Sequence, residues 1–279
     1  MNQIKILDVK INIISKNEVL DKIKNLLLSN TNEQHQLVTT NPEFIFEAQK
    51  DAEFKNIINN SWLSVADGYG IKLATKYLDL IKNKNSRILK FFIGLKIAWW
   101  GITRNDEKLN IIKEIITGAD LIPEICKLVN NKIFLLGGYN NTSELTAENL
   151  KKQNPNLQIN YSVFETHNII EKINNFQTDI LFVALNHPHA QKWINENLSK
   201  MPSVKLAIGV GGAFDYISGK IKRAPENLQS SYEWIYRLKK EPRRFKRIFN
   251  AVVRFSWLVF TNSLKNSTRI SKITIINQN

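Results

Sequence analysis

A short apolar run, a polar or glycine-containing turn and a segment of helical spacing follow one another repeatedly along this chain. The apolar runs lie at residues 36–40, 62–66, 133–136, 180–185 and 205–210. The first, QLVTT, is rich in β-forming residues, and the other four are mostly apolar, as buried strands are. Strands that alternate with helices in this way form a largely parallel sheet with helices on both faces. We therefore expect an α/β fold of the Rossmann-like type.

The turns that follow these runs are the first places to look for a site, because ligands of such sheets bind outside the carboxyl ends of the strands. The turns contain Thr39, Thr40, Asn41, Asp67, Gly68, Gly137, Gly138, Asn186, His187, Gly211, Gly212 and Asp215. Helical spacing resumes at 43–59, at 71–80, from Thr142 and through Trp193. Glycine turns that open a helix offer backbone N–H groups to an anion such as a diphosphate, although many glycines serve only backbone conformation.

Several common kinds of site are disfavoured by the motifs that the sequence lacks. No G-x-G-x-x-G follows the first strand, and neither a P-loop nor a G-x-S-x-G elbow occurs. Asp-x-Asp, which would hold a metal and a nucleotide sugar, is also missing. His187 and His189 lie two residues apart in a loop, which is not zinc spacing, and Cys126 is the single cysteine. We expect neither a metal nor a cofactor.

Asp67 is the strongest candidate for a catalytic group. It follows an apolar strand and precedes Gly68, so its carboxylate is expected to point into the crevice. A carboxylate there can act as a general base on a sugar hydroxyl. The alternative is a helix-capping or turn aspartate without a chemical role.

The positive charge is confined to two segments. The whole chain has 39 Lys and Arg, 25 Asp and Glu and a formal net charge of +14. Residues 80–113 carry a net +6 and residues 219–279 a net +11, so the rest is close to neutral. Both segments also contain tryptophans, a mixture that suits an anionic bilayer or a nucleic acid, or simply a solvated basic face. No apolar run approaches the roughly 20 residues of a membrane span, so a membrane-bound form would lie on the bilayer.

These segments suggest the domain organisation. We expect an α/β domain over 1–218, with a basic aromatic insertion at about 80–113, and a basic helical C-terminal appendage over 219–279. In the insertion one helical face is expected to contain Phe91, Phe92, Leu95, Ala98 and Trp99, flanked by Lys90, Lys96 and Arg104. This pattern predicts a second membrane contact or, alternatively, a hydrophobic hairpin packed on the body.

An ordered series of motifs extends over most of the chain. They are TTNPE at 39–43, ADGYG at 66–70, TGADL at 117–121, FLLGG at 134–138, GVGGAFDYISGKIKRAP at 209–225, EWIYRL at 233–238 and EPRR at 241–244. In order and spacing, over about residues 36–249, the series resembles the WecG/TagA/CpsF family of bacterial glycosyltransferases.

The resemblance implies transfer of an N-acetylmannosamine-type sugar from a UDP donor to an undecaprenyl-diphosphate-linked N-acetylglucosamine. It implies metal-independent, inverting chemistry in the synthesis of teichoic acid, enterobacterial common antigen, capsule or related exopolysaccharide. Asp67 would be the base, and Thr39 and Asn41 would line the donor pocket. The further substrate-binding candidates are Gly137, Gly138, Gln191, Gly211, Gly212 and Asp215.

The resemblance also implies where the protein works. Arginines of the C-terminal appendage would meet the acceptor's diphosphate and the membrane; the matching residues are Arg237, Arg243, Arg244 and Arg247. The expected location is cytoplasmic, peripherally bound to the inner face of the bacterial cell membrane, with a homo-oligomer possible and no nucleic-acid partner.

The sequence departs from the family pattern at two site positions. Ile115 stands where the family has an arginine, and Ala190 stands where it has a glutamine. The consequences left open are a different donor sugar, compensation by His189 or Gln191, or weakened catalysis. A non-catalytic relative that binds lipid diphosphate or a partner enzyme is the main alternative, and a nucleic-acid-binding protein is a weaker one. The retained Asp67 favours an enzyme.

Overall fold

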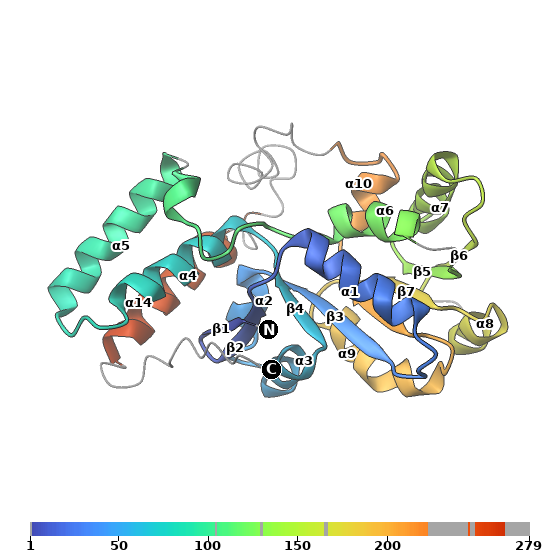
Figure 1. The fold of residues 1–279 in the computed structure, drawn as a ribbon, viewed down its shortest axis with the longest axis horizontal. Helices are drawn as coiled ribbons and strands as arrows, with labels where there is room; N and C mark the ends of the chain where they lie inside the picture. The colour runs from blue at the N-terminus through green and yellow to red at the C-terminus, as the bar shows by residue number, and fades with distance from the viewer. Residues whose placement is uncertain are drawn as a thin grey trace.

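A six-stranded sheet lies at the centre of the molecule. The computed structural model describes residues 2–103, 105–128, 131–164, 167–222, 245 and 249–265. The strands of the sheet are β3 (His35–Thr40), β4 (Leu63–Ala66), β5 (Ile133–Gly137), β6 (Ile159–Ser162), β7 (Ile180–Ala184) and β8 (Leu206–Gly209). Their order is β4-β3-β8-β7-β5-β6, and every neighbouring pair is parallel (Figure 1). The predicted α/β fold with a parallel sheet is therefore confirmed.

Alternate residues of the inner strands enter different hydrophobic cores, as the pleat requires. In β5, Leu135 packs in the core on one face of the sheet, whereas Phe134 and Leu136 pack on the opposite face. The first face is covered by α1 (Lys16–Leu28), α6 (Gly118–Leu128), α7 (Thr142–Gln153) and the short α10 (Ala213–Ile217). On the other face lie α8 (Ile169–Asn175), α9 (His189–Asn197) and the turn η2 (Leu198–Lys200).

An antiparallel hairpin lies beside the β4 edge of the sheet. Its strands are β1 (Gln3–Ile6) and β2 (Val9–Asn12). Asn12 Oδ1 accepts a hydrogen bond from the Ser64 N–H at 2.7 Å, and Ser64 Oγ donates to the Lys10 carbonyl at 2.6 Å. These contacts satisfy polar groups along an edge that would otherwise be exposed.

The segment predicted as one helix over 43–59 forms two helices. They are α2 (Pro42–Glu47) and α3 (Ala52–Asn60). The Asp51 carboxylate accepts a hydrogen bond from the Phe54 N–H at 2.9 Å, so it caps a new helix rather than continuing the old one. The apolar spacing is right for both helices, but the cap divides them.

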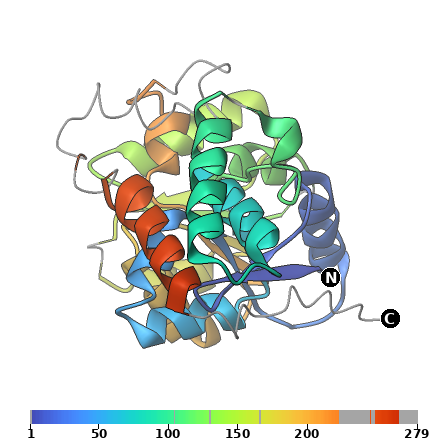
Figure 2. The same cartoon turned by 90° about the vertical axis from the view of Figure 1, so that its left-hand side faces the viewer.

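Three helices form a lobe at one end of the molecule. They are α4 (Tyr69–Ile81), α5 (Arg87–Ile102) and α14 (Phe255–Lys265), with the 3₁₀ turn η1 (Asp106–Lys108) after α5 and the π-helical turn η4 (Asn250–Arg254) before α14 (Figures 1 and 2). Tyr77, Ile97 and Phe255 are buried between them, in a core that continues to Val38 of the sheet. None of the described helices is both long and apolar enough to cross a membrane.

Lys90 does not flank an exposed face, as the sequence suggested. Its side chain is fully buried, and its Nζ donates a hydrogen bond to the Ser263 carbonyl at 2.6 Å. Burial lowers the pKa of this ammonium, with the nearby Arg87 as a smaller cause. Lys90 therefore joins α5 to α14, and the expectation that it meets solvent or lipid is wrong.

Candidate active site

A cleft of about 1480 Å³ lies at the carboxyl ends of the strands. It brings together residues from the turns after β3, β4, β5, β7 and β8, as expected for an open α/β sheet. The predicted site residues on its wall are Thr39, Asn41, Asp67, Gly138, Gln191, Gly211, Gly212 and Asp215. Gly137 is not on the wall.

The turns after β3 and β4 form one unit. The Asp67 N–H donates to the Thr40 carbonyl at 2.9 Å, so the pairing of the two strands extends beyond their ends. A Cβ on Gly70 would lie 2.8 Å from Cγ of Pro42, and one on Gly68 would lie 3.3 Å from its Cδ. The TTNPE and ADGYG motifs therefore share one packed contact, which fixes Asp67 on the cleft wall.

Asp67 does not occupy the N-cap position of α4. The N-cap of α4 is Gly68, whose φ of +99° lies in the region that favours glycine. Asn41, by contrast, is a cap: its Oδ1 accepts the Phe44 N–H at 3.0 Å at the start of α2. Because the cap uses the amide oxygen, the Asn41 side-chain nitrogen is the group that can donate to a ligand.

The glycines of the turns after β5 and β8 have different physical roles. A Cβ on Gly137 would lie 2.8 Å from the Ala184 carbonyl oxygen of the adjacent strand, so this glycine permits close backbone packing. Gly138 and Gly211 both have positive φ and lie on the cleft wall. At Gly211 no atom lies within 4 Å of where a Cβ would be, so that backbone is open to the cleft.

The turn before α6 places an apolar side chain at the cleft. Thr117 Oγ1 donates to Asp120 Oδ2 at 2.7 Å and accepts the Asp120 N–H at 3.2 Å, which caps α6. The Ile116 N–H donates to the Ala66 carbonyl at 2.8 Å, so this segment runs beside the end of β4. Ile115 therefore lies on the cleft wall near Asp67.

Ala190 and Gln191, in the first turn of α9, both pack against Gly209 of β8, but only Gln191 lines the cleft. Ala190 is fully buried in the core beneath the sheet and is not part of the cleft wall. Gln191 is on the wall, 1% exposed, and packed so tightly on β8 that a Cβ on Gly209 would lie 2.6 Å from its Nε2. Its Oε1 is buried and has no hydrogen-bond partner. A buried amide oxygen of this kind is suited to receive a hydrogen bond from a ligand.

The sequence model of the glycosyl transferase WecG/TagA/CpsF family matches residues 4–96 and 94–269. The chain belongs to this family. It is a glycosyltransferase, as the family and its relatives are.

Two relatives illustrate the similarity. The N-acetylglucosaminyldiphosphoundecaprenol N-acetyl-beta-D-mannosaminyltransferase of Bacillus subtilis (strain 168) is 28% identical over 220 residues, which cover 76% of this chain and 74% of the relative. The enzyme of the same name from Staphylococcus aureus (strain MRSA252) is 27% identical over 236 residues, 83% of this chain and 82% of the relative. The resemblance found from the motifs is therefore confirmed.

The two departures from the family pattern have different structural meanings. Where the motif resemblance leads us to expect a glutamine, Ala190 is buried in the core, whereas the neighbouring Gln191 lines the cleft. Where the resemblance leads us to expect an arginine, the uncharged Ile115 lines the cleft. The lysines on the wall within the described residues are Lys16, Lys72, Lys113 and Lys192.

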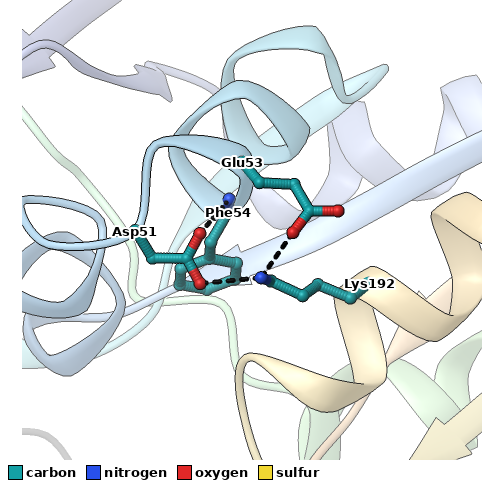
Figure 3. Close-up of polar contacts among 4 residues, drawn as sticks. All are labelled: Asp51, Glu53, Phe54 and Lys192. Atoms are coloured by element: carbon teal, nitrogen blue, oxygen red, sulfur yellow. Dashed lines mark hydrogen bonds and ion pairs between the residues drawn. The ribbon is translucent and has the colours of Figure 1, made fainter.

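Lys192 ties α9 to α3 beside the cleft. Its Nζ lies 2.8 Å from Asp51 Oδ2 and 2.5 Å from Glu53 Oε2 (Figure 3). Hydrogen bonds to Asp51, and to a smaller extent to Glu53, raise the pKa of Lys192. The hydrogen bond from Lys192 in turn lowers the pKa of Asp51. The sequence analysis missed this contact, because nothing local connects residues 51 and 192.

A second cluster missed from the sequence lies where the insertion meets the cleft. Tyr69 Oη donates to Asp106 Oδ1 at 2.8 Å, and Lys72 Nζ lies 3.6 Å from the same oxygen. All three residues line the cleft. Tyr69 and Lys72 are three residues apart on α4, which is a signal that they share a face, but their partner in the insertion could not be deduced.

The remaining expectations about the site concern residues elsewhere. Arg237, Arg243, Arg244 and Arg247 lie outside the described residues. Among the described residues, no group of three or more His, Cys, Asp or Glu is arranged to hold a metal ion. Burial raises the pKa of the Cys126 thiol to about 12, so this cysteine is an inert core residue.

Proposed function

We propose that this glycosyltransferase moves an N-acetylmannosamine-type sugar from a UDP donor to the N-acetylglucosamine of an undecaprenyl-diphosphate-linked acceptor, at the inner face of the cell membrane. The observation that carries the proposal is the position of Asp67 on the cleft wall, on a turn fixed by Thr40 and Pro42. The names of the two relatives support the choice of sugar and acceptor.

In the proposed reaction Asp67 acts as the general base. Its carboxylate takes the proton of the acceptor hydroxyl while the hydroxyl oxygen forms a bond to the anomeric carbon of the donor sugar. The bond from that carbon to the diphosphate oxygen breaks, and its electron pair leaves with UDP. Attack from the side opposite the leaving group inverts the anomeric configuration, and no metal takes part.

The cleft offers groups for both substrates. Its volume of about 1480 Å³ exceeds the roughly 300–1,000 Å³ of a pocket for one small ligand, as two substrates require. The open backbone at Gly211, with Gly212 next to it and Gly138 also on the cleft wall, would meet the donor's diphosphate. Asn41 and the buried Gln191 amide would orient the donor, with Thr39 and Asp215 beside them.

Substitution of the base tests this assignment. Asp67→Asn keeps the shape of the side chain but removes the proton acceptor, so kcat should fall by about 10²–10⁴-fold while the affinity for UDP stays within about twofold. The matched control is Asp21→Asn, which changes an exposed carboxylate on α1. Near-normal turnover by Asp67→Asn would show that Asp67 is not the base.

Ile115 motivates one alternative function. An arginine lost from the cleft removes a fixed charge and five donors, which could leave a protein that binds lipid diphosphate without transferring sugar. Binding of a short-chain prenyl-diphosphate acceptor without release of UDP from any of a panel of UDP-sugars would support that alternative.

A further inference from the structure

Helix α5 presents a row of large apolar side chains to solvent. Ile88, Phe92, Leu95, Trp99 and Ile102 are 72%, 60%, 53%, 63% and 64% exposed. They recur every three or four residues, so they lie along one side of the helix. A single exposed apolar residue is ordinary, but a continuous row of this length marks a surface that binds something.

The row continues onto the neighbouring helix. Phe91 of α5 and Phe260 of α14 have ring centroids 6.2 Å apart, and Phe260 lies 5.9 Å from Trp257. Trp257 of α14 is itself exposed, as is Val253 of the turn η4 that leads into it. Helices α5 and α14 contact each other, and Figure 2 shows them side by side at this end of the molecule. We call the exposed apolar residues of these two helices the α5–α14 face.

Buried contacts hold the α5–α14 face together from below. The Lys90 ammonium donates to the Ser263 carbonyl at 2.6 Å, and the Ser263 hydroxyl shares a hydrogen bond of 2.9 Å with Tyr77 Oη of α4. Ile97 and Val259 are buried beneath the face. The exposed row is therefore the outer side of a packed lobe.

The charges around the α5–α14 face are positive. Lys82 and Lys84 are exposed between α4 and α5, and Arg87 is exposed at the start of α5. Lys96 is exposed within α5, 5.0 Å from the Trp100 ring. No Asp or Glu occurs in the sequence between Asp79 and Asp106. Two copies joined through this face would bring like charges together, whereas anionic lipid headgroups would neutralise them.

The face adjoins the cleft. Val252 and Ser256 line the cleft, and the neighbouring Val253 and Trp257 are exposed. A Cβ on Gly101 of α5 would lie 3.1 Å from Leu73, which is also on the cleft wall. The lobe thus contributes residues both to the cleft wall and to the adjoining apolar surface.

We propose that the α5–α14 face docks on an anionic bilayer, with α5 lying in the plane of the headgroups and its apolar side chains among the acyl chains. At 16 residues α5 is short of the roughly 20 needed to span, and its exposed tryptophan suits the interface. Docking brings the cleft to the surface in which a lipid-linked acceptor resides. That consequence rests on the proposed function, whereas the docking itself does not.

The test uses full-length protein and flotation with vesicles of phosphatidylcholine alone or mixed with phosphatidylglycerol. Replacing Phe92, Leu95 and Trp99 together by serine should weaken binding to the anionic vesicles by about tenfold or more. Melting temperature should be unchanged, because all three side chains are exposed. Leu28→Ser, an equally exposed change on α1, is the matched control and should bind as the unaltered protein does.

Two results would overturn the docking face. One is vesicle binding by the triple variant equal to that of the unaltered protein. The other is a dimer in sedimentation that the triple substitution converts to a monomer while vesicle binding persists, which would assign the face to a second copy. If the unaltered protein binds vesicles through this face but transfers no sugar to either a vesicle-embedded or a soluble acceptor, the docking stands and the proposed function fails.

Discussion

Of the two consecutive residues Ala190 and Gln191, only the second lines the cleft. Ala190 is buried in the core and Gln191 carries an unpartnered amide oxygen on the cleft wall. Sequence comparison with the family pattern assigns the site position to Ala190. In the folded chain the adjacent amide occupies the cleft, which favours compensation among the outcomes left open.

We therefore expect substitutions at these two positions to have different effects. Gln191→Leu should raise the KM for the UDP-sugar by about tenfold or more, with unfolding free energy unchanged or increased, because it removes a buried unsatisfied group. Ala190→Gln should cost about 1–3 kcal/mol of stability by overpacking the core. Steady-state kinetics give the KM of both variants, and denaturant unfolding gives their stability. An Ala190→Gln variant that is fully stable and more active would place residue 190 in the cleft instead.

Lys192 gives a prediction about pH. The folded state lowers the pKa of Asp51, so its contribution to stability is present above its ordinary pKa of 3.8 and is lost as pH falls through the lowered value. The pKa of Lys192 is raised, so its contribution is lost only in strongly alkaline solution. Lys192→Met should therefore lower the melting temperature at pH 7, and the difference should shrink below about pH 4.

Thermal melting from pH 3 to pH 8 measures that difference. Lys172→Met, a change on α8 away from the cleft, is the control. A difference between Lys192→Met and the unaltered protein that is constant across this range would mean that Asp51 is not the partner that matters.

At the scale of elements, five of the six parallel strands were predictable because each is a short run of apolar or β-branched residues that ends at a polar or glycine turn, as strands buried on both faces do. The missed strand is β6, an edge strand whose middle residues Asn160 and Tyr161 are exposed. The helix of the insertion was predictable from its spacing. The burial of Lys90 was not, since its partner Ser263 lies 173 residues away.

The joint between α5 and α14 gives a prediction at this scale. Lys90→Met should leave the Ser263 carbonyl without its donor and cost about 1–3 kcal/mol of unfolding free energy. Lys96→Met, the same change at an exposed position of the same helix, should alter stability by less than about 0.5 kcal/mol. Denaturant unfolding compares the two. Equal effects of both substitutions would contradict the structural role assigned to Lys90.

At the scale of the whole molecule, the helices proposed to dock on the membrane pack into the same core as the sheet that forms the cleft. Helix α14 belongs to the segment expected as a C-terminal appendage, yet Phe255 and Val259 are buried in the core that includes the sheet residue Val38. The candidate site could be predicted in large part because its residues follow the strands that the sequence identifies. The parts of the cleft wall that α4, η1 and α14 form could not be predicted, because they depend on the packing of segments far apart in the sequence.

The central claim is the transfer itself, and it is tested most directly by product analysis. The full-length protein is incubated in EDTA with UDP-N-acetylmannosamine and a short-chain prenyl-diphosphate-linked N-acetylglucosamine, and both UDP release and the new linkage are followed. The account predicts a disaccharide lipid with inverted anomeric configuration, formed in step with UDP and lost in Asp67→Asn. No disaccharide from this or any other UDP-sugar, with the acceptor bound, would contradict it.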